Sequence, residues 1–416
     1  MTAGTLGIVA SSSARLVVQK FGGTSVADAG RIRSVADYVA RTRRQRQVVV
    51  VVSAMGKETD DLIHLANQVS GTLPGRELDM LLTVGERKSM ALLCMALHDI
   101  GVAADSFTGS QAGIITDTDH GQAKILEVRG DRIRETLAAG RVPVVAGFQG
   151  MSTARDITTL GRGGSDTTAV ALAAALGAEE VEIYTDVSGV FTADPRVVPG
   201  ARRLQKLSFE EMLEMAANGC PKPEMRAVEF ARNHGVRMHV RSSFTWEPGT
   251  LVDEEDPQME QAIVSAVISD TSEAKVTVAG VPDKPGIAAR LFRTLAEHSV
   301  NVDMIVQNVS RHGITDISFT VPKTDLAAGM DVCRAHATEI AAEEVLADTD
   351  IAKVSLIGAG MKTHPGIAAT MFETLAGEGV NIEMISTSPI RISCVVRADR
   401  VEDAVVALHD AFKLGE

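Results

Sequence analysis

The first two-thirds of the chain alternates short apolar runs with segments of helical periodicity. Residues 15–20 form one such run, and residues 48–52 are five consecutive valines. A continuous apolar run is typical of a strand buried on both faces, because a half-exposed strand would alternate with polar residues. Further strand-like runs lie at 142–146 and 181–185, with a helical, Ala-rich segment at 166–176. Strand, crossover helix and strand in this order predict an α/β fold with a mainly parallel sheet between helical layers.

The last third of the chain contains an internal repeat. Residues 275–280 (KVTVAG) match 353–358 (KVSLIG), and the sequence PGIAA follows in both copies. Strand, turn, helix and strand recur in one order, which predicts two α+β ferredoxin-like units of the βαββαβ type. The second copy ends before its last strand. We expect residues 263–269 to supply that strand, so that the first unit is inserted in the second.

The region between the two parts is acidic and contains turn-forming Pro-Gly and Asp-Pro pairs, which are typical of a linker. The expected organisation is a disordered tail at 1–14, an α/β domain at 15–247, a linker at 248–262, and the repeat at 263–416, with its first unit at about 270–350 and its second formed by 263–269 plus 351–416.

Composition excludes several classes of protein. The 416 residues are 45% hydrophobic and 23% charged, as in a soluble globular protein. The net charge of −13 and the 3% aromatic content argue against nucleic acid or a membrane surface as a partner. No apolar run approaches the roughly 20 residues that span a bilayer. The four scattered cysteines predict a cytoplasmic protein, and the histidines form no H-x-x-x-H pair typical of a zinc site, so no protein metal ligands are expected.

The first segment with candidate chemistry follows the first predicted strand. Lys20 ends that strand, and Phe21, Gly22, Gly23, Thr24 and Ser25 follow. Glycines allow the backbone to approach a ligand, and free N–H groups beside an ammonium form an anion site. The alternative is an ordinary turn with a solvated lysine. The segment is neither a Walker A loop nor a G-x-G-x-x-G motif.

A second glycine-rich segment, residues 161–166 (GRGGSD), precedes the Ala-rich helix. Arg162 in this loop is suited to a carboxylate or phosphate, because its planar guanidinium binds either one bidentately. Ser165 is the predicted N-cap, and Asp166 lies in the first turn, where its structural alternative is simple helix capping. A third polar segment, residues 184–196 (YTDVSGVFTADPR), leaves a strand and suits a nucleotide without being specific for one.

Together these segments resemble the amino-acid kinase superfamily, specifically the aspartate kinases. The resemblance rests on KFGGTS, TVGER, GRGGSDTT and TDVSGVFTADPR, and the repeat is similar to the tandem ACT domains of the lysine- and threonine-regulated, actinobacterial type. It covers residues 16 to 414. It implies transfer of the γ-phosphoryl group of MgATP to the β-carboxylate of L-aspartate, giving 4-phospho-L-aspartate. This is the first step of lysine, threonine and methionine biosynthesis, and Mg²⁺ is expected with the ATP.

The resemblance also implies the site residues. The expected catalytic residues are Lys20 and Asp166. The expected ATP contacts are Lys20, Phe21, Gly22, Gly23, Thr185, Asp186, Phe191, Thr192, Asp194, Pro195, Arg196 and Lys222. The expected aspartate contacts are Ser53, Glu86, Arg162, Gly163, Gly164 and Ser165. Among these, Arg162 is expected to clamp a carboxylate and Glu86 to pair with the α-ammonium, the alternative for Glu86 being a capping carboxylate.

One departure affects the nucleotide site. The family usually has a nucleotide-contacting lysine two residues after the glycine, whereas residues 219–224 read GCPKPE, so that Lys222 is one residue late and lies between two prolines. Proline fixes φ and removes an N–H donor, so this loop runs differently from that of its relatives. Whether Lys222 replaces the usual lysine stays open.

The repeat is expected to bind lysine and/or threonine as effectors. In the first copy Asp283 is the predicted helix cap, and the free N–H groups there can hold an α-carboxylate. The expected effector contacts are Asp283, Gly286, Ile287, Ala288, Asn301, Asp303, Gln307, Asn381, Ile382, Thr387 and Ser388. Pro389 stands where relatives often have Glu, so the effector's identity stays open, and a purely structural pair of units is the alternative. Paired ACT units imply a homo-oligomer or an α/β hetero-oligomer, with Met259 as a possible internal start.

Two other functions are compatible with the sequence. A kinase for another small carboxylate, such as N-acetylglutamate, would need no ammonium partner at Glu86 and is not expected to carry ACT units. An amino-acid-sensing protein with a silent kinase domain has only the shifted Lys222 in its favour.

Overall fold

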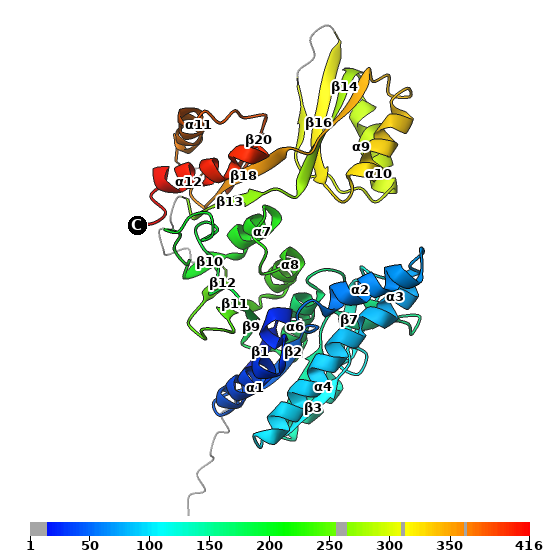
Figure 1. The fold of residues 1–416 in the computed structure, drawn as a ribbon, viewed down its shortest axis with the longest axis vertical. Helices are drawn as coiled ribbons and strands as arrows, with labels where there is room; N and C mark the ends of the chain where they lie inside the picture. The colour runs from blue at the N-terminus through cyan, green and yellow to red at the C-terminus, as the bar shows by residue number, and fades with distance from the viewer. Residues whose placement is uncertain (1–14, 255–263, 309–312, 362–363) are drawn as a thin grey trace, which may run out of the picture. The chain divides into compact units, whose positions relative to one another are not determined.

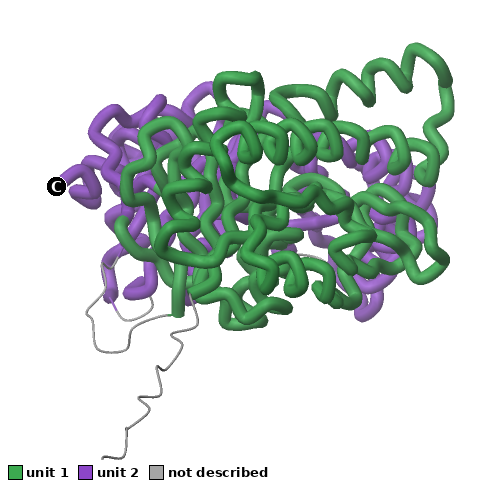
Figure 2. The backbone as a smooth tube through the Cα atoms, turned by 90° about the horizontal axis from the view of Figure 1, so that it is seen from below, with its two compact units in different colours: residues 1–190, 205–209, 222–255 green, residues 191–204, 210–221, 256–416 purple. Residues whose placement is uncertain are grey.

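The computed structural model describes residues 15–254, 264–308, 313–361 and 364–416. The chain divides into two compact units. Unit 1 comprises residues 1–190, 205–209 and 222–255, and unit 2 comprises residues 191–204, 210–221 and 256–416 (Figure 2). The predicted tail at 1–14 and the possible start at Met259 lie outside the described residues. Among the described helices, none combines the length and apolar character needed to cross a membrane.

Unit 1 is an α/β domain in which helices and strands alternate along the chain (Figure 1). Its elements are β1 (Leu16–Phe21), η1 (Gly23–Val26), α1 (Ala29–Arg43), β2 (Gln47–Val52), α2 (Glu58–Val69), α3 (Gly75–Leu82), α4 (Val84–Asp99), β3 (Ala104–Phe107), β4 (Ile114–Thr116), β5 (Ile125–Val128), α5 (Asp131–Ala138), β6 (Val142–Ala146), β7 (Gln149–Ser152), β8 (Ile157–Thr159), α6 (Gly164–Leu176), β9 (Glu180–Thr185), β10 (Lys206–Ser208), α8 (Met225–His234), β11 (Arg237–Ser242) and β12 (Thr250–Asp253).

The main sheet has eight strands in the order β10-β12-β11-β9-β1-β2-β6-β3, and a second sheet has the order β5-β4-β7-β8. In the main sheet the run from β11 to β3 is parallel throughout, while β12 is antiparallel to β11. The predicted mainly parallel sheet is therefore confirmed. Strand β12 lies within residues 248–262, where a linker was expected, and the later part of that range, from residue 255, lies outside the described residues.

The valine run at 48–52 is buried as predicted, with every residue at most 1% exposed. Val48, Val50 and Val52 share a hydrophobic cluster with residues of α1 and α4. Helix α6 packs against β1, β2 and β9, and all of its residues from Gly164 to Ala173 are buried. From Ala169 onward the helix is apolar on every side, which requires such a position, and α6 is also in contact with α8.

Unit 2 contains the repeat together with α7 (Phe209–Ala217), whose first residue belongs to unit 1. The first copy holds β14 (Glu273–Pro282), α9 (Ile287–Glu297), β15 (Ile305–Gln307), β16 (Ile314–Pro322), α10 (Leu326–His336) and β17 (Glu344–Asp348). The second holds β18 (Ile351–Ile357), α11 (Ile367–Gly377), β19 (Met384–Ser388), β20 (Arg391–Arg397), η2 (Ala398–Arg400) and α12 (Val401–Ala411), with β13 (Ala266–Asp270) preceding both.

Each copy forms its own four-stranded antiparallel sheet. The first has the order β15-β16-β14-β17 and the second has the order β13-β18-β20-β19. Strand β13 pairs antiparallel with β18, from Ala266 opposite Ile357 to Asp270 opposite Lys353. The strand that precedes the first copy therefore completes the second, and the predicted insertion of one unit in the other is confirmed.

Residues 191–204 belong to unit 2, although the sequence placed them in the α/β domain. Ala193 and Val198 are buried in the hydrophobic core of the second copy. Thr192 bonds to His409 of α12 at 2.9 Å, and its carbonyl accepts from Val267 of β13. The strand-to-loop pattern of the sequence could not show this, because the packing partners are distant in the chain.

Candidate functional site

The centre of the candidate site is a buried ion pair between Lys20 and Asp166. Lys20 lies near the carboxyl end of β1, and Asp166 lies in the first turn of α6, which packs on that strand. Lys20 Nζ is 2.5 Å from Asp166 Oδ1, and the side chains are 4% and 0% exposed. The structure therefore brings together the two residues that were expected to be catalytic.

Burial and mutual attraction act against each other in this pair. Burial lowers the pKa of Lys20 from its usual value, and the attraction of Asp166 offsets only part of that effect. For Asp166, burial alone would raise the pKa of the carboxyl. The charges of Lys20 and Lys222 outweigh it, so the pKa is lowered. Asp166 is therefore held as a carboxylate.

The shifted lysine reaches the same carboxylate. Lys222 Nζ lies 3.6 Å from Asp166 Oδ2, and the backbone N–H of Glu224 donates to that oxygen at 3.5 Å. Two cations thus flank Asp166, one buried and one 36% exposed. The displacement of Lys222 by one residue does not remove it from the site. Its contact with ATP stays a prediction.

Glycine is required at position 163 by the local packing, in addition to its expected role in letting the backbone approach a ligand. It adopts φ +70°, and a Cβ there would lie 2.1 Å from Cγ of Glu224. Gly163 is also the N-cap of α6, which begins at Gly164. The prediction that Ser165 caps this helix is therefore wrong. Ser165 is a buried residue of the first turn, and the left-handed glycine provides the sharp entry that no serine can adopt at low cost.

Glu86 provides a second buried carboxylate. It lies in the first turn of α4 and is 3% exposed. Its Oε1 accepts from the N–H of Ala54 at 3.1 Å, whereas Oε2 has no hydrogen-bond partner among the described residues. Burial raises the pKa of Glu86 to about 7. A buried acceptor without a partner suits a cationic ligand group, because such an atom otherwise carries its full desolvation cost.

The other expected aspartate contacts lie around these carboxylates. Arg162 is exposed in the turn before α6, and it forms no hydrogen bond or ion pair with another described side chain. Ser53 follows β2 directly and is half-buried, and its N–H donates to the carbonyl of Phe21 at 3.0 Å. Gly164 packs closely on Leu160. The site therefore offers an exposed guanidinium and a buried carboxylate, the two charges that an amino acid requires.

The expected ATP contacts divide between the two units. In unit 1, Gly22 donates its N–H to the carbonyl of Tyr184, and Gly23 lies against Ala54. Thr185 ends β9, the neighbour of β1, and donates its hydroxyl to the exposed Asp186 at 3.0 Å. Lys20 and Asp186 thus lie at the carboxyl ends of adjacent parallel strands, where ligands of such sheets bind.

The remaining ATP candidates belong to unit 2. Phe191 is half-buried, and Thr192 is 1% exposed with its hydroxyl bonded to His409 and to the N–H of Arg202. Asp194 is paired with Arg196 at 2.6 Å, and a hydrogen bond from this guanidinium lowers the pKa of Asp194. Pro195 lies exposed between them. These residues stay predicted nucleotide contacts.

The effector candidates lie at helix entrances and edge strands of unit 2. Helix α9 begins at Ile287 with Gly286 as its N-cap, at φ +96°. The prediction that Asp283 caps this helix is therefore wrong, because the exposed Asp283 lies before the turn that contains Gly286. Ala288 is half-buried in α9. Asn301 and Gln307 are exposed, as are Asn381 and Thr387, whereas Ile382 is half-buried.

Two effector candidates are already bonded to other residues. Asp303 Oδ2 accepts from Lys353 Nζ at 2.6 Å, and Ser388 donates its hydroxyl to Glu214 of α7 at 3.3 Å. Neither contact could be predicted from the pattern within one copy. Asp303 of the first copy bonds to the second copy, and Ser388 of the second copy bonds to α7.

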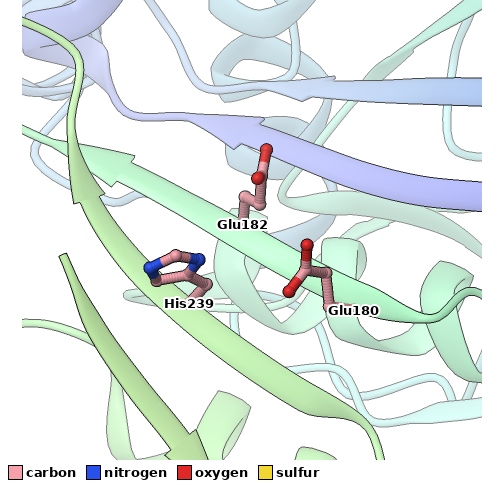
Figure 3. Close-up of side chains that lie close together, drawn as sticks. All are labelled: Glu180, Glu182 and His239. Atoms are coloured by element: carbon pink, nitrogen blue, oxygen red, sulfur yellow. The ribbon is translucent and has the colours of Figure 1, made fainter. Parts of the chain in front are cut away.

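The amino end of the sheet carries another cluster of titratable groups. Glu180 and Glu182 of β9 and His239 of β11 have ligand atoms within 4.8 Å of one another (Figure 3). Glu180 is paired with Arg46 at 2.5 Å, and Glu182 with Arg241 at 3.0 Å. Because two guanidiniums already balance the two carboxylates, we regard the cluster as an ion-pair network and assign it no metal.

Comparison with known proteins decides the family. The amino acid kinase family matches residues 15–242, and an ACT domain family matches residues 276–336 and 354–412. An aspartokinase of Mycolicibacterium smegmatis is 56% identical over 406 residues, which is 96% of each chain. The chain belongs to the aspartokinase family. An aspartokinase of Pseudomonas aeruginosa is 52% identical over 402 residues, covering 96% of this chain and 98% of the relative.

A solved aspartokinase shares the fold. The structure of Escherichia coli aspartokinase III in complex with aspartate and ADP has a TM-score of 0.82 and 26% identity, and the match covers 95% of this chain and 99% of that one. The chain is thus an ATP-dependent kinase of the aspartokinase family with ACT domains at its C-terminal end. The expected resemblance is confirmed, and the alternative of an N-acetylglutamate kinase finds no support.

Sequence reasoning missed two residues that shape the site. Glu224 supplies an N–H to Asp166 and packs on Gly163, and Gly85 allows Ala54 to approach Glu86, since a Cβ on Gly85 would lie 2.6 Å from that of Ala54. The position of Gly85 directly before Glu86 was a usable signal. Glu224 gave none beyond its place after Pro223.

Proposed function

We propose that this aspartokinase transfers the γ-phosphoryl group of MgATP to the β-carboxylate of L-aspartate, giving 4-phospho-L-aspartate. The observation that carries the proposal is that two lysines and a buried carboxylate oxygen without a hydrogen-bond partner occur in the same domain. Lys20 and Lys222 flank Asp166 at the carboxyl edge of the sheet, and Glu86 retains an unpartnered carboxylate oxygen.

The cationic centre accounts for the phosphoryl-transfer step. Charge spreads over the oxygens of the transferring group, so catalysis depends on positioning and on neutralising that charge. Lys20 faces the group with an ammonium whose direction is fixed by Asp166. Lys222 adds a second, more exposed charge. The acceptor carboxylate attacks directly, so no covalent intermediate on the protein is required. Mg²⁺ enters with ATP, and we assign it no protein ligand.

The acceptor is recognised by two opposite charges. In this proposal Glu86 Oε2 pairs with the α-ammonium of aspartate, and Arg162 binds a carboxylate through its guanidinium. An acetylated substrate lacks the ammonium and would leave Glu86 unpaired in a buried position, which is unfavourable. The free amino acid is therefore the substrate class that fits.

Regulation by lysine and/or threonine extends the proposal to the ACT units. A solved structure of Escherichia coli aspartokinase III is described as a complex with lysine and aspartate, with a TM-score of 0.73 and 26% identity to this chain. We infer that exposed residues such as Asn301 and Asn381 contribute to effector binding here. The product would enter lysine, threonine and methionine biosynthesis in the cytoplasm. The edge strands β15 and β19 would join chains in an oligomer.

A coupled assay of ADP release tests the proposal. Purified chain, MgATP and L-aspartate are expected to release ADP at a rate that requires both aspartate and Mg²⁺, and ³¹P NMR is expected to show an acyl phosphate. Absence of aspartate-dependent ADP release from folded protein would refute the function and favour a sensing protein with a silent kinase domain. Repeating the assay with lysine and threonine, singly and together, tests the regulatory part.

A further inference from the structure

A buried carboxylate outside the described site joins the two sides of the proposed aspartate pocket. Asp79 lies in α3 and is 1% exposed. Its Oδ1 accepts from the hydroxyl of Thr159 at 2.5 Å, and its Oδ2 accepts from Nδ1 of His120 at 2.7 Å. The N–H of Gly121 lies 3.2 Å from both oxygens. Every donor comes from outside α3, so the carboxylate ties this helix to two other segments, the turn at His120–Gly121 and the end of β8.

One side of this junction leads to Arg162. Thr159 is the last residue of β8, and its carbonyl accepts from the N–H of Ala123 at 2.9 Å. Only Leu160 and Gly161 separate Thr159 from Arg162. The carbonyl of Leu160 accepts from Arg226, which also bonds to the carbonyl of Ala123. Arg226 therefore holds the base of the turn that carries Arg162 against the segment at Ala123, while Arg162 itself is exposed.

The other side leads to Glu86. The carbonyl of Asp79 accepts from the N–H of Thr83 at 3.2 Å, and Thr83 is the single residue between α3 and α4. Thr83 is fully buried, and its carbonyl accepts from the side chain of Gln149. Glu86 follows in the first turn of α4. A shift of α3 relative to β8 would thus change the distance between Glu86 and Arg162.

We propose that Asp79 is a positioning residue for aspartate, which sets the spacing between the ammonium partner Glu86 and the carboxylate partner Arg162. The inference rests on the proposed roles of those two residues. Asp79 contacts no substrate itself. Its effect is expected in the binding of aspartate and not of MgATP, because the Lys20–Asp166 centre is held by other contacts.

Two neighbouring threonines allow a matched experiment on the full-length chain. Thr159→Val removes the hydroxyl that bonds to Asp79. Thr158→Val removes an equally buried hydroxyl, which bonds to Thr116 at 2.6 Å and does not contact Asp79. Both changes preserve shape. Asp79→Asn removes the carboxylate, and Thr159→Ser keeps the hydroxyl.

The expected results separate positioning from general damage. Because small displacements of a binding group cost large factors in rate, Asp79→Asn is expected to raise KM for aspartate about tenfold or more, and Thr159→Val about fivefold. KM for MgATP is expected to stay within about twofold in both, as is every constant of Thr158→Val and Thr159→Ser. The double variant Asp79→Asn/Thr159→Val is expected to be no worse than Asp79→Asn, since both changes remove one interaction.

A second readout does not depend on the substrate. In ligand-free protein, amide hydrogen exchange at residues 159–163 is expected to be faster in Asp79→Asn and Thr159→Val than in Thr158→Val. Equal exchange in all three, or equal KM for aspartate in Thr159→Val and Thr158→Val, would overturn the inference. If the wild type shows no activity with aspartate, the proposed function fails by itself, and the exchange rates still decide whether Asp79 holds the turn.

Discussion

Lys353 of the second ACT copy lies 2.6 Å from Asp303 of the first, measured from Nζ to Oδ2. The repeat contains the reciprocal contact. Lys275 occupies in the first copy the place of Lys353 in the second, and it is paired with Glu383, the counterpart of Asp303. Each copy therefore gives a lysine to the other and receives one. The duplication has produced a pseudo-symmetric pair of ionic contacts that hold the two copies together.

The two contacts are not equivalent in burial, which predicts unequal effects on stability. Lys353 is 1% exposed and also bonds to Glu273 at 2.9 Å, and these carboxylates raise its pKa against the opposing effect of burial. Lys353→Met would leave a buried, uncompensated Glu273, so the free energy of unfolding is expected to fall by about 3–5 kcal/mol. Urea denaturation followed by circular dichroism measures the change.

Lys275→Met is the matched control. Lys275 is 20% exposed, and its partner Glu383 retains Arg397 at 3.4 Å. A loss of about 1 kcal/mol or less is therefore expected. Equal losses in the two variants would show that burial does not distinguish the contacts.

Much of the fold could be predicted because its signals are local. The five valines at 48–52 identify a buried strand without knowledge of its neighbours, and counting the strands of the repeat is enough to assign β13 to the second copy. Strand β12 has no such signal. Its four residues form a strand only because β11 and β10 lie on either side, and both pairings are set by tertiary structure.

The site was less predictable, since its geometry depends on distant packing. Ser165 and Asp283 were predicted to cap α6 and α9, but the N-caps are Gly163 and Gly286, both in the left-handed conformation. At Gly163 the close approach of Glu224 also leaves no room for a side chain. The expectation that Lys20 and Asp166 are catalytic came from family resemblance, because no periodicity links a strand end to a helix start so far along the chain. The contact of Lys222 with Asp166 could not be predicted from the sequence, because it depends on how the loop at 219–224 folds back on α6.

Removal of the buried cation is expected to affect chemistry more than substrate binding. In Lys20→Met the transferring group would lose the cation that we propose to neutralise its charge, so kcat is expected to fall by about 10²–10³. Asp166→Asn is expected to have a similar effect, because Lys20 would lose the carboxylate that directs it. Steady-state ADP release measures both.

Lys323→Met serves as the control, since Lys323 is exposed in unit 2. It is expected to match the wild type. A folded Lys20→Met variant, checked by circular dichroism, that keeps a kcat within twofold of the wild type would rule out the assigned role of Lys20.

The raised pKa of Glu86 predicts a pH dependence of aspartate binding. Only the carboxylate can pair with the ammonium, and the pKa is about 7. The ratio kcat/KM for aspartate is therefore expected to rise with pH up to about 7 and to level off above it. Glu86→Gln is expected to lower this ratio by about a hundredfold and to remove that step from the profile. An unchanged profile in the variant would assign the titration to another group.

The raised pKa of Glu86 also affects the stability of the fold, which is expected to fall with rising pH whereas aspartate binding improves. A carboxyl whose pKa is raised by folding binds more protons in the native state, so its contribution to stability falls as the pH rises from about 4.5 to about 7. Glu86→Gln removes this loss. The variant is therefore expected to have a higher Tm than the wild type at pH 8 and a similar Tm at pH 4.5. A lower Tm at pH 8 would show that the carboxylate is stabilised in ways that its burial does not reveal.

Helix α7 is bonded to the second ACT copy and precedes Lys222 in the chain, which predicts a route for regulation. Glu214 of this helix is paired with Arg391 at 3.3 Å and accepts from Ser388, so it is bonded at both ends of the turn between β19 and β20. Asn218, which follows the helix, accepts from the hydroxyl of Ser355 at 3.1 Å. Four residues later the chain reaches Lys222, which contacts Asp166. If the proposed effector binds at β19, a change at the Glu214 and Asn218 contacts is therefore expected to reach the Lys222 loop along the chain.

Glu214→Gln tests this route because it weakens the contact without shortening the side chain. The effector concentration for half-inhibition is expected to rise about fivefold or more, while kcat without effector stays within about twofold. Glu373→Gln, an exposed change on α11 of the same copy, is expected to leave inhibition unchanged. Identical inhibition curves for Glu214→Gln and the wild type would mean that the signal does not pass through α7. A parallel loss of kcat would mean that Glu214 supports the catalytic loop whether or not an effector is bound.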